Sequence, residues 1–181
     1  MDSITVNHLT TKFDYADFKS AAAQAAIDKN EKMILRVTGI VLLFSALILS
    51  YYFRGNVYQN IIYGVMGAVG IIIGCFYEVI AHYFAQQRAF IEYENNKEKF
   101  IAQLTVFHEK QVQIQTDRYT AAIPYSFLYK VYENDKVFII YTGIDEMRFI
   151  PKRAVSDNEC LQIRTILQSQ LQEKYQQEGA H

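Results

Sequence analysis

The sequence predicts an α+β protein that combines a two-helix transmembrane hairpin with a small antiparallel β roll closed by a C-terminal helix. Three observations predict it. Two apolar runs without a charged residue lie between Val37 and Tyr77, interrupted only by a short connection. From Gln103 onward apolar and polar residues alternate, as in half-buried strands. A helix-start signal at Ser156 then introduces a final amphipathic stretch.

The average composition conceals this division. The chain has 181 residues, 18 of them basic and 19 acidic, and a mean hydropathy of −0.03, which are values typical of a soluble domain. The balanced charge argues against polybasic binding, so no nucleic-acid partner is expected. The two cysteines, Cys75 and Cys160, are too few for a disulfide scaffold or a cysteine zinc site, and both are interpreted as packing residues.

The apolar runs, Val37–Phe53 and Val57–Tyr77, predict two membrane spans. A hydrocarbon core about 30 Å thick takes roughly 20 helical residues. Only Arg54-Gly55-Asn56 separates the runs, and a chain of this size could hardly bury both as core helices of a soluble domain. A cleaved signal peptide fits poorly, because the first run starts far from the N-terminus and lacks a small-residue cleavage site.

Basic residues predict the orientation of this hairpin. They lie before the first span and after the second, whereas the connection offers only Arg54. The flanking residues are Lys29, Lys32, Arg36, Arg88, Lys97 and Lys99. The positive-inside rule therefore places both termini in the cytoplasm. Neither span core contains a charge or a proline, so a transport path is not indicated.

Small residues predict how the two spans pack, because helices in lipid associate through close contacts between small side chains. An antiparallel hairpin brings Arg36 and Glu78 to the same depth, which predicts an ion pair at the cytoplasmic interface. Alternatively, each of these side chains reaches water separately, and the glycine face could instead bind a second copy in a homodimer. The candidate helix-packing residues are Arg36, Gly39, Ala46, Gly64, Gly67, Gly70, Gly74 and Glu78.

The remaining segments divide the chain further. We expect a cytoplasmic strand and helix over residues 1–32, the hairpin over 33–80 with spans at about 33–53 and 57–79, a helical linker over 81–102 and a cytoplasmic domain over 103–181. The helices on either side of the hairpin are expected to continue beyond the membrane and to pack side by side. Alternatively, both fray near the membrane surface. The domain is expected to contain about six short strands at meander spacing, followed by the C-terminal helix. One face of that helix carries Cys160, Ile163, Leu167 and Leu171.

The order of these elements and several local segments resemble the bacterial YcxB-like family. The segments are IPYSFLYKVYEND, FIIYTGIDEMRFIPKRAV and, within the latter, Ile150-Pro151-Lys152-Arg153-Ala154. The resemblance implies a multi-pass protein of the bacterial cytoplasmic (inner) membrane, with a cytoplasmic domain similar to pleckstrin-homology-like (PH-like) rolls. The family has no established catalytic activity, so the resemblance implies architecture and location only.

Searches for chemistry in the sequence find little. No hydrolase, P-loop, zinc-protease or dinucleotide motif is present, and the four histidines lack metal-ligand spacing. The paired carboxylates Asp145-Glu146 are interpreted as solvated surface. No catalytic, cofactor-binding or metal-binding residue is therefore predicted, and no cofactor is expected.

One basic cluster, Arg148, Lys152 and Arg153, is the candidate contact for an anionic lipid or a partner. Alternatively, these side chains are only surface residues that end the last strand. We expect a non-enzymatic membrane protein whose cytoplasmic domain is a protein-interaction or regulatory module with an unidentified protein partner. The alternatives are recognition of anionic lipid headgroups, or a role as accessory subunit of a transporter or membrane enzyme.

Overall fold

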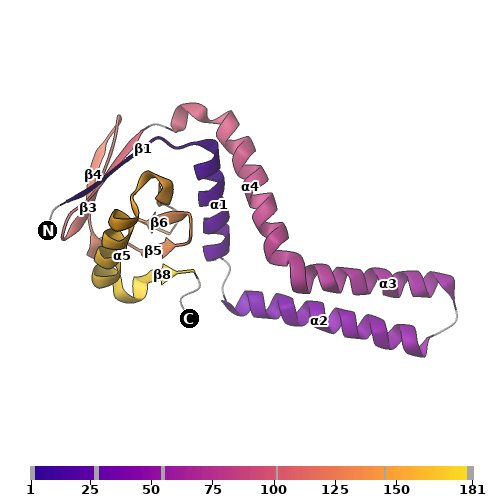
Figure 1. Ribbon diagram of the computed structural model, residues 1–181. Helices are drawn as coiled ribbons and strands as arrows, with labels where there is room; N and C mark the ends of the chain where they lie inside the picture. Colours follow the sequence, from indigo (N-terminus) through magenta and orange to yellow (C-terminus); the bar gives the residue numbers. More distant parts are fainter. Residues whose placement is uncertain (1–2, 27–28, 54–55, 101, 145, 179–181) are drawn as a thin grey trace. The chain divides into compact units, whose positions relative to one another are not determined.

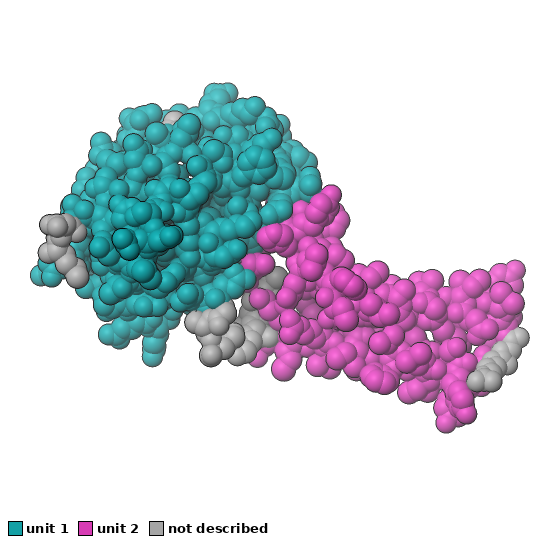
Figure 2. Space-filling model, in the orientation of Figure 1, with its two compact units in different colours: residues 1–22, 86–181 teal, residues 23–85 magenta. Residues whose placement is uncertain are grey.

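The computed structural model describes residues 3–26, 29–53, 56–100, 102–144 and 146–178. The chain divides into two compact units, which Figure 2 shows in different colours. We call residues 1–22 together with 86–181 the domain unit, and residues 23–85 the hairpin unit. The segments before and after the hairpin thus belong to the same unit.

The first sheet of the domain unit joins the N-terminal strand to three later strands. Its order is β1 (Ile4–His8), β2 (Gln103–Phe107), β3 (Gln111–Thr116) and β4 (Thr120–Pro124), and all neighbours are antiparallel. The sequence analysis had assigned the strand near Ile4 to a segment of its own. In the structure, Val6 of β1 lies opposite Thr105 of β2.

The second sheet has the order β7-β6-β5-β8. Its strands are β5 (Lys130–Glu133), β6 (Val137–Tyr141), β7 (Met147–Pro151) and β8 (Tyr175–Gln177), and only the pair β5–β8 is parallel. Every residue of β6 is buried, as expected for a central strand. The six meander strands expected from the alternation are therefore present, whereas the short strand β8 was not predicted.

The C-terminal helix α5 (Asp157–Leu171) lies in the chain between β7 and β8 of the second sheet (Figure 1). It begins with the capping box that the sequence indicated: Glu159 N donates to Ser156 Oγ, and Ser156 N donates to Glu159 Oε2 at 3.0 Å. Ile163, Leu167 and Leu171 are buried in the core that both sheets contribute to, and Cys160 packs at its margin. The expected apolar face of this helix is confirmed.

Two further helices contact each other through side chains within the domain unit. Helix α1 (Lys12–Ala26) contacts the part of α4 (Tyr77–Asn95) that lies after residue 86. The rings of Phe13 and Phe90 meet edge to face with centroids 5.9 Å apart, and Lys19 Nζ lies 3.2 Å from Glu92 Oε2. Helix α4 ends at Asn95 and is followed by a 3₁₀ turn, η2 (Lys97–Lys99), before β2 begins.

The hairpin unit contains two apolar helices that lie side by side (Figure 1). Helix α2 (Lys29–Tyr52) precedes the connection. Helix α3 (Val57–Ile71), the π-helical turn η1 (Ile72–Phe76) and α4 follow it as one helical stretch. Both stretches are long and apolar enough to cross a membrane, and most of their apolar residues are exposed. Outward-facing apolar residues suit lipid as the surrounding solvent, because a core helix of a soluble protein would be buried.

Candidate functional site

The hairpin is held together where glycines of the two helices meet. An added Cβ at Gly39 would lie 2.5 Å from Gly74 N and 2.7 Å from Gly70 O. One turn further along the contact, Gly67 lies against Ala46. This close approach of two backbones is the packing that small residues permit in lipid.

Not all of the candidate packing residues lie in this contact. Nothing lies within 4 Å of a Cβ added at Gly64, so that residue faces away from α2. The contact steps from Gly74 to Gly70 and Gly67. Of the candidate glycines on the second helical stretch, Gly67, Gly70 and Gly74 therefore lie in the contact and Gly64 does not.

The structure contains the ion pair between the two ends of the hairpin. Arg36 Nη2 donates to Glu78 Oε1 at 3.0 Å, and both side chains are partly exposed. Arg36 lies in the first half of α2 and Glu78 in the first turn of α4, so the pair joins the two helical stretches at the end away from their connection.

In the domain unit the three candidate basic residues do not form one free patch. Lys152 donates to Glu133 Oε1 at 2.5 Å, and Arg153 is paired with Asp14. Arg148 instead lies over the ring of Tyr119, 5.7 Å from its centroid. Of the three, Arg148 alone lacks a carboxylate partner among the described residues.

A buried carboxylate, which the sequence analysis did not single out, organises the second sheet. Glu133 is fully buried and accepts hydrogen bonds from Lys152, from Arg164 of α5 and from Tyr175 of β8. Strand β5 is thereby joined to η4 (Lys152–Ala154), α5 and β8. The sequence gives only a weak indication of these ion pairs, because no local pattern shows which distant lysine or arginine will contact the glutamate that ends β5.

A second carboxylate joins the start of α1 to the turn η4 that follows β7. Thr11 N donates to Asp14 Oδ2 at 2.7 Å, and Asp14 N donates back to Thr11 Oγ1. Arg153 donates to both carboxylate oxygens. Burial alone would raise the pKa of Asp14, but the hydrogen bonds from Arg153 and Thr11 outweigh it and hold this pKa below its usual range.

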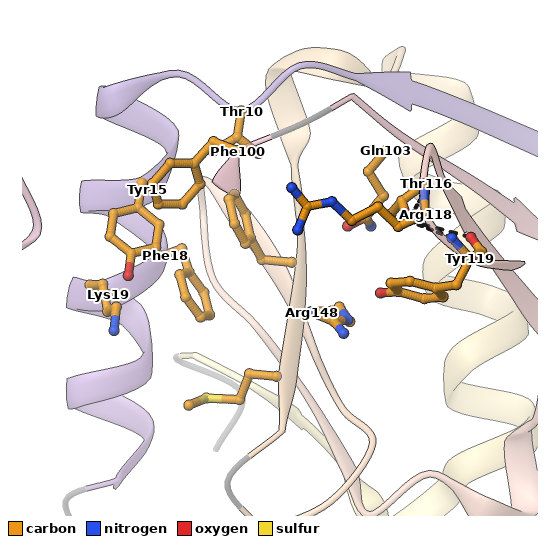
Figure 3. A pocket seen from close by; sticks show the side chains of 12 residues that line it. Thr10, Tyr15, Phe18, Lys19, Phe100, Gln103, Thr116, Arg118, Tyr119 and Arg148 are labelled. Atoms are coloured by element: carbon orange, nitrogen blue, oxygen red, sulfur yellow. Dashed lines mark hydrogen bonds between the residues drawn. The ribbon is translucent and has the colours of Figure 1, made fainter. Parts of the chain in front are cut away.

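A pocket of about 410 Å³ lies in the domain unit between α1, the β3–β4 turn and β7 (Figure 3). Arg118 and Arg148 extend from the strand side toward its centre, and aromatic side chains of α1 line the opposite wall (Figure 3). The sequence analysis identified Arg148 but not Arg118, because the pocket depends on segments far apart in the chain.

The remaining candidate chemistry is dispersed. Within the described ranges, no three His, Cys, Asp or Glu side chains are grouped so that they could hold a metal ion. His8 is buried in β1, whereas His82 lies on α4 and His108 in the β2–β3 turn. Four residues of the sequence analysis lie outside the described residues: Arg54, Gly55, Asp145 and His181.

Fold and site together define a class: a mixed helix and antiparallel-sheet domain joined to two helices able to cross a membrane. Within this chain, residues 107–167 match the family model described as YcxB-like protein, which confirms the resemblance found in the sequence. The matched segment runs from the end of β2 into α5. No curated protein and no solved structure matches the chain.

Proposed function

We propose that this protein is a membrane-anchored, non-enzymatic binding module of the bacterial cytoplasmic membrane. In this proposal α2 and α3 span the bilayer, both termini lie in the cytoplasm, and the domain unit is a PH-like roll that binds a protein partner. The match of residues 107–167 to the YcxB-like family supports the bacterial assignment.

The observation that carries the proposal is the pairing of β1 with β2. The hairpin is an insertion between two adjacent strands of one sheet, so two chain segments connect the domain unit to its anchor. One segment leads into α2 and the other returns through α4. Such a double connection suits a module that keeps whatever it binds at the membrane.

The order of elements supports the PH-like assignment. Four antiparallel strands form one sheet, three further antiparallel strands form most of the second, and α5 packs its apolar face into the common core. The assignment therefore rests on topology and packing, and on no similarity to a solved structure.

Binding is favoured over chemistry because the buried carboxylates are used for structure. Asp14 is paired with Arg153, and Glu133 with Lys152 and Arg164. A general acid or base needs a proton that it can exchange with a substrate, whereas these carboxylates are hydrogen-bonded within the fold.

A protein partner is favoured over an anionic lipid bound at the basic cluster of Arg148, Lys152 and Arg153, because Lys152 and Arg153 already form ion pairs within the domain unit. The glycine face is used within one chain, so the proposal requires no homodimer.

Two exposed apolar side chains are the proposed contacts for the partner. Phe127 and Ile144 are 76% and 77% exposed on the domain unit. Aromatic and aliphatic side chains of this kind anchor protein interfaces.

Crosslinking in membranes tests the binding role. With p-benzoylphenylalanine at position 127 or 144 of the full chain, irradiation of intact membranes is expected to give a discrete protein adduct. Position 115, an exposed glutamine on β3, serves as the matched control and is expected to give none. Absence of protein adducts at both apolar positions, or identical adducts at position 115, would overturn the proposed interaction.

Cysteine labelling tests the orientation separately. In a chain with both native cysteines replaced by alanine, an impermeant maleimide is expected to label Gln59→Cys in intact cells. It is expected to label Gln170→Cys only after lysis. The reverse pattern would refute cytoplasmic termini.

A further inference from the structure

The pocket between α1, the β3–β4 turn and β7 has an unbalanced positive charge. Three cationic side chains line it, Lys19, Arg118 and Arg148, and among the residues that the structure describes no carboxylate does. Lys19 is already paired with Glu92. Neither guanidinium has a carboxylate partner among the described residues, and Asp117, next to Arg118 in the chain, does not line the pocket.

The structure positions both arginines. Arg118 lies in a tight turn in which Thr116 N donates to Tyr119 O at 2.9 Å, while Thr116 Oγ1 accepts from Tyr119 N at 3.3 Å. Tyr119 from the same turn lies under the guanidinium of Arg148. Stacking of this kind orients a guanidinium and leaves its edge free to donate hydrogen bonds.

The opposite wall is apolar. Tyr15 and Phe18 of α1, Phe100, and Phe149 of β7 contribute aromatic rings, and Phe18 stacks on Phe149 with centroids 4.5 Å apart. Besides Lys19, Tyr119 and the two arginines, the polar residues Thr10, Gln103 and Thr116 and the apolar Met147 complete the lining. A volume of about 410 Å³ is within the range of small-ligand sites, which are commonly apolar with a few convergent polar groups.

We infer that this pocket binds a phosphate monoester that carries an apolar or aromatic group. Two arginines without counter-charge match an anion of nearly two charges, because a phosphate monoester carries about −1.5 to −2 at pH 7. A single carboxylate carries one negative charge and would leave one of the two positive charges uncompensated. The aromatic wall then receives the organic part of the ligand. The inference builds on the proposed function only in that the domain unit acts by binding.

Phenyl phosphate is the probe, since it combines the monoester with a ring. The full chain is reconstituted in nanodiscs of phosphatidylcholine, and binding is measured by calorimetric titration. Phenyl phosphate is expected to bind more tightly than inorganic phosphate. The variants R118Q and R148Q are each expected to weaken binding by about tenfold or more, because each removes a charge-assisted hydrogen-bond donor. The matched control is R88Q, which removes an exposed arginine of α4 outside the pocket and is expected to leave binding unchanged.

The same measurement distinguishes a lipid source from a soluble one. If a phosphate-monoester lipid is the ligand, phosphatidic acid in the disc lowers the apparent affinity for phenyl phosphate. Phosphatidylglycerol at equal surface charge does not. If the ligand is soluble, the two anionic lipids have the same effect. Either result supports the phosphate chemistry and identifies its source.

Lack of phenyl phosphate binding by the folded wild-type chain would overturn the inference. So would equal losses in R88Q and the two pocket variants, with the far-ultraviolet circular dichroism unchanged. Neither result touches the crosslinking at positions 127 and 144, so failure of this inference is distinguishable from failure of the proposed function.

Discussion

At the scale of single residues, two buried polar side chains differ in whether they have hydrogen-bond partners. Glu133 is fully buried and has three donor side chains around it, whereas His8 is buried beside Phe149 with no hydrogen-bond partner for either ring nitrogen among the described residues. Burial lowers the pKa of His8; Asp14 counteracts this and Arg153 adds to it. His8 is therefore neutral in the folded protein at neutral pH.

The pH dependence of stability is expected to reveal His8. Because its pKa is lower in the folded state than its ordinary value of 6.5, acidification protonates the unfolded chain first. Stability is thus full above about pH 7 and is lost as the pH falls below about 6.5. Thermal unfolding followed by circular dichroism between pH 5 and 7.5 measures this, in a window above the titration of Asp14. His8→Leu is expected to flatten the profile. An unchanged slope in His8→Leu would contradict the assignment.

The ion cluster at Glu133 is expected to be a major contributor to domain stability. Glu133→Gln leaves Lys152 and Arg164 without their carboxylate, and breaking a buried ion pair by removing one partner costs about 3–5 kcal/mol. Urea unfolding of the full chain in detergent checks this value. Glu109→Gln, an exposed glutamate in the β2–β3 turn, is the control and is expected to change stability by less than about 0.5 kcal/mol. A similar midpoint for both variants would show that the cluster does not stabilise the fold.

At the scale of elements, the hairpin depends on close backbone contact rather than on the hydrophobic effect. The glycines of the second helical stretch are not equivalent: Gly70 and Gly74 contact the backbone of α2, whereas Gly64 faces open space. Composition alone identifies all of them as packing candidates. Which of these glycines lie in the contact depends on the rotation of the second helix about its axis, and that rotation is set by the glycines that contact Gly39.

Substitution at Gly39 is expected to open the hairpin. The added Cβ of Gly39→Ala would meet backbone atoms of Gly74 and Gly70 at 2.5–2.7 Å, and neither backbone can move aside without separating the helices. Overpacking of this kind costs about 1–3 kcal/mol. Gly64→Ala is the matched control, with no atom within 4 Å of the new methyl group. Unfolding of the helices by increasing SDS, followed by circular dichroism, is the measurement. Gly39→Ala is expected to unfold at a lower SDS concentration than Gly64→Ala. Equal resistance of both variants would refute the packing geometry.

At the scale of the whole molecule, the N-terminal strand is part of a domain most of which lies after the membrane hairpin. Ile4 and Val6 are buried in the same core as Phe138 and Leu167. The core of the domain therefore includes side chains from both sides of the hairpin.

A charge in β1 is expected to destabilise this distant core. Val6→Asp buries an unpaired carboxylate and is expected to cost about 3–5 kcal/mol. Thr5→Asp, on the exposed face of the same strand, is the control. Limited proteolysis is the measurement: cleavage within residues 103–171 is expected to accelerate in Val6→Asp alone. If that segment stays protected, it folds without β1.

Much of the fold was predictable because its signals are local. The apolar runs mark α2 and α3, the period of two marks β2 to β7, and Ser156 with Glu159 marks the start of α5. The Arg36–Glu78 pair was also predictable, since an antiparallel hairpin with a short connection leaves little freedom in register.

The candidate site was predicted less well, because its residues come from distant segments. Arg148, Lys152 and Arg153 look equivalent in sequence, yet Tyr119, Glu133 and Asp14 respectively lie beside them in the structure. Charge patterns along the chain show how many cations are present. They do not show which cations are already paired.

By itself, the sequence determined the two membrane-spanning candidates, the meander and the capped final helix, because hydrophobic periodicity and capping act over a few residues. Tertiary structure alone decided that β1 completes the first sheet and that Arg118 and Arg148 line one pocket. It also decided that two of the three candidate cations, Lys152 and Arg153, are paired with Glu133 and Asp14. The physical reason is that burial and charge pairing are properties of surfaces in contact. In this chain the partners of two of these contacts, β1 with β2 and Asp14 with Arg153, are separated in sequence by the whole hairpin.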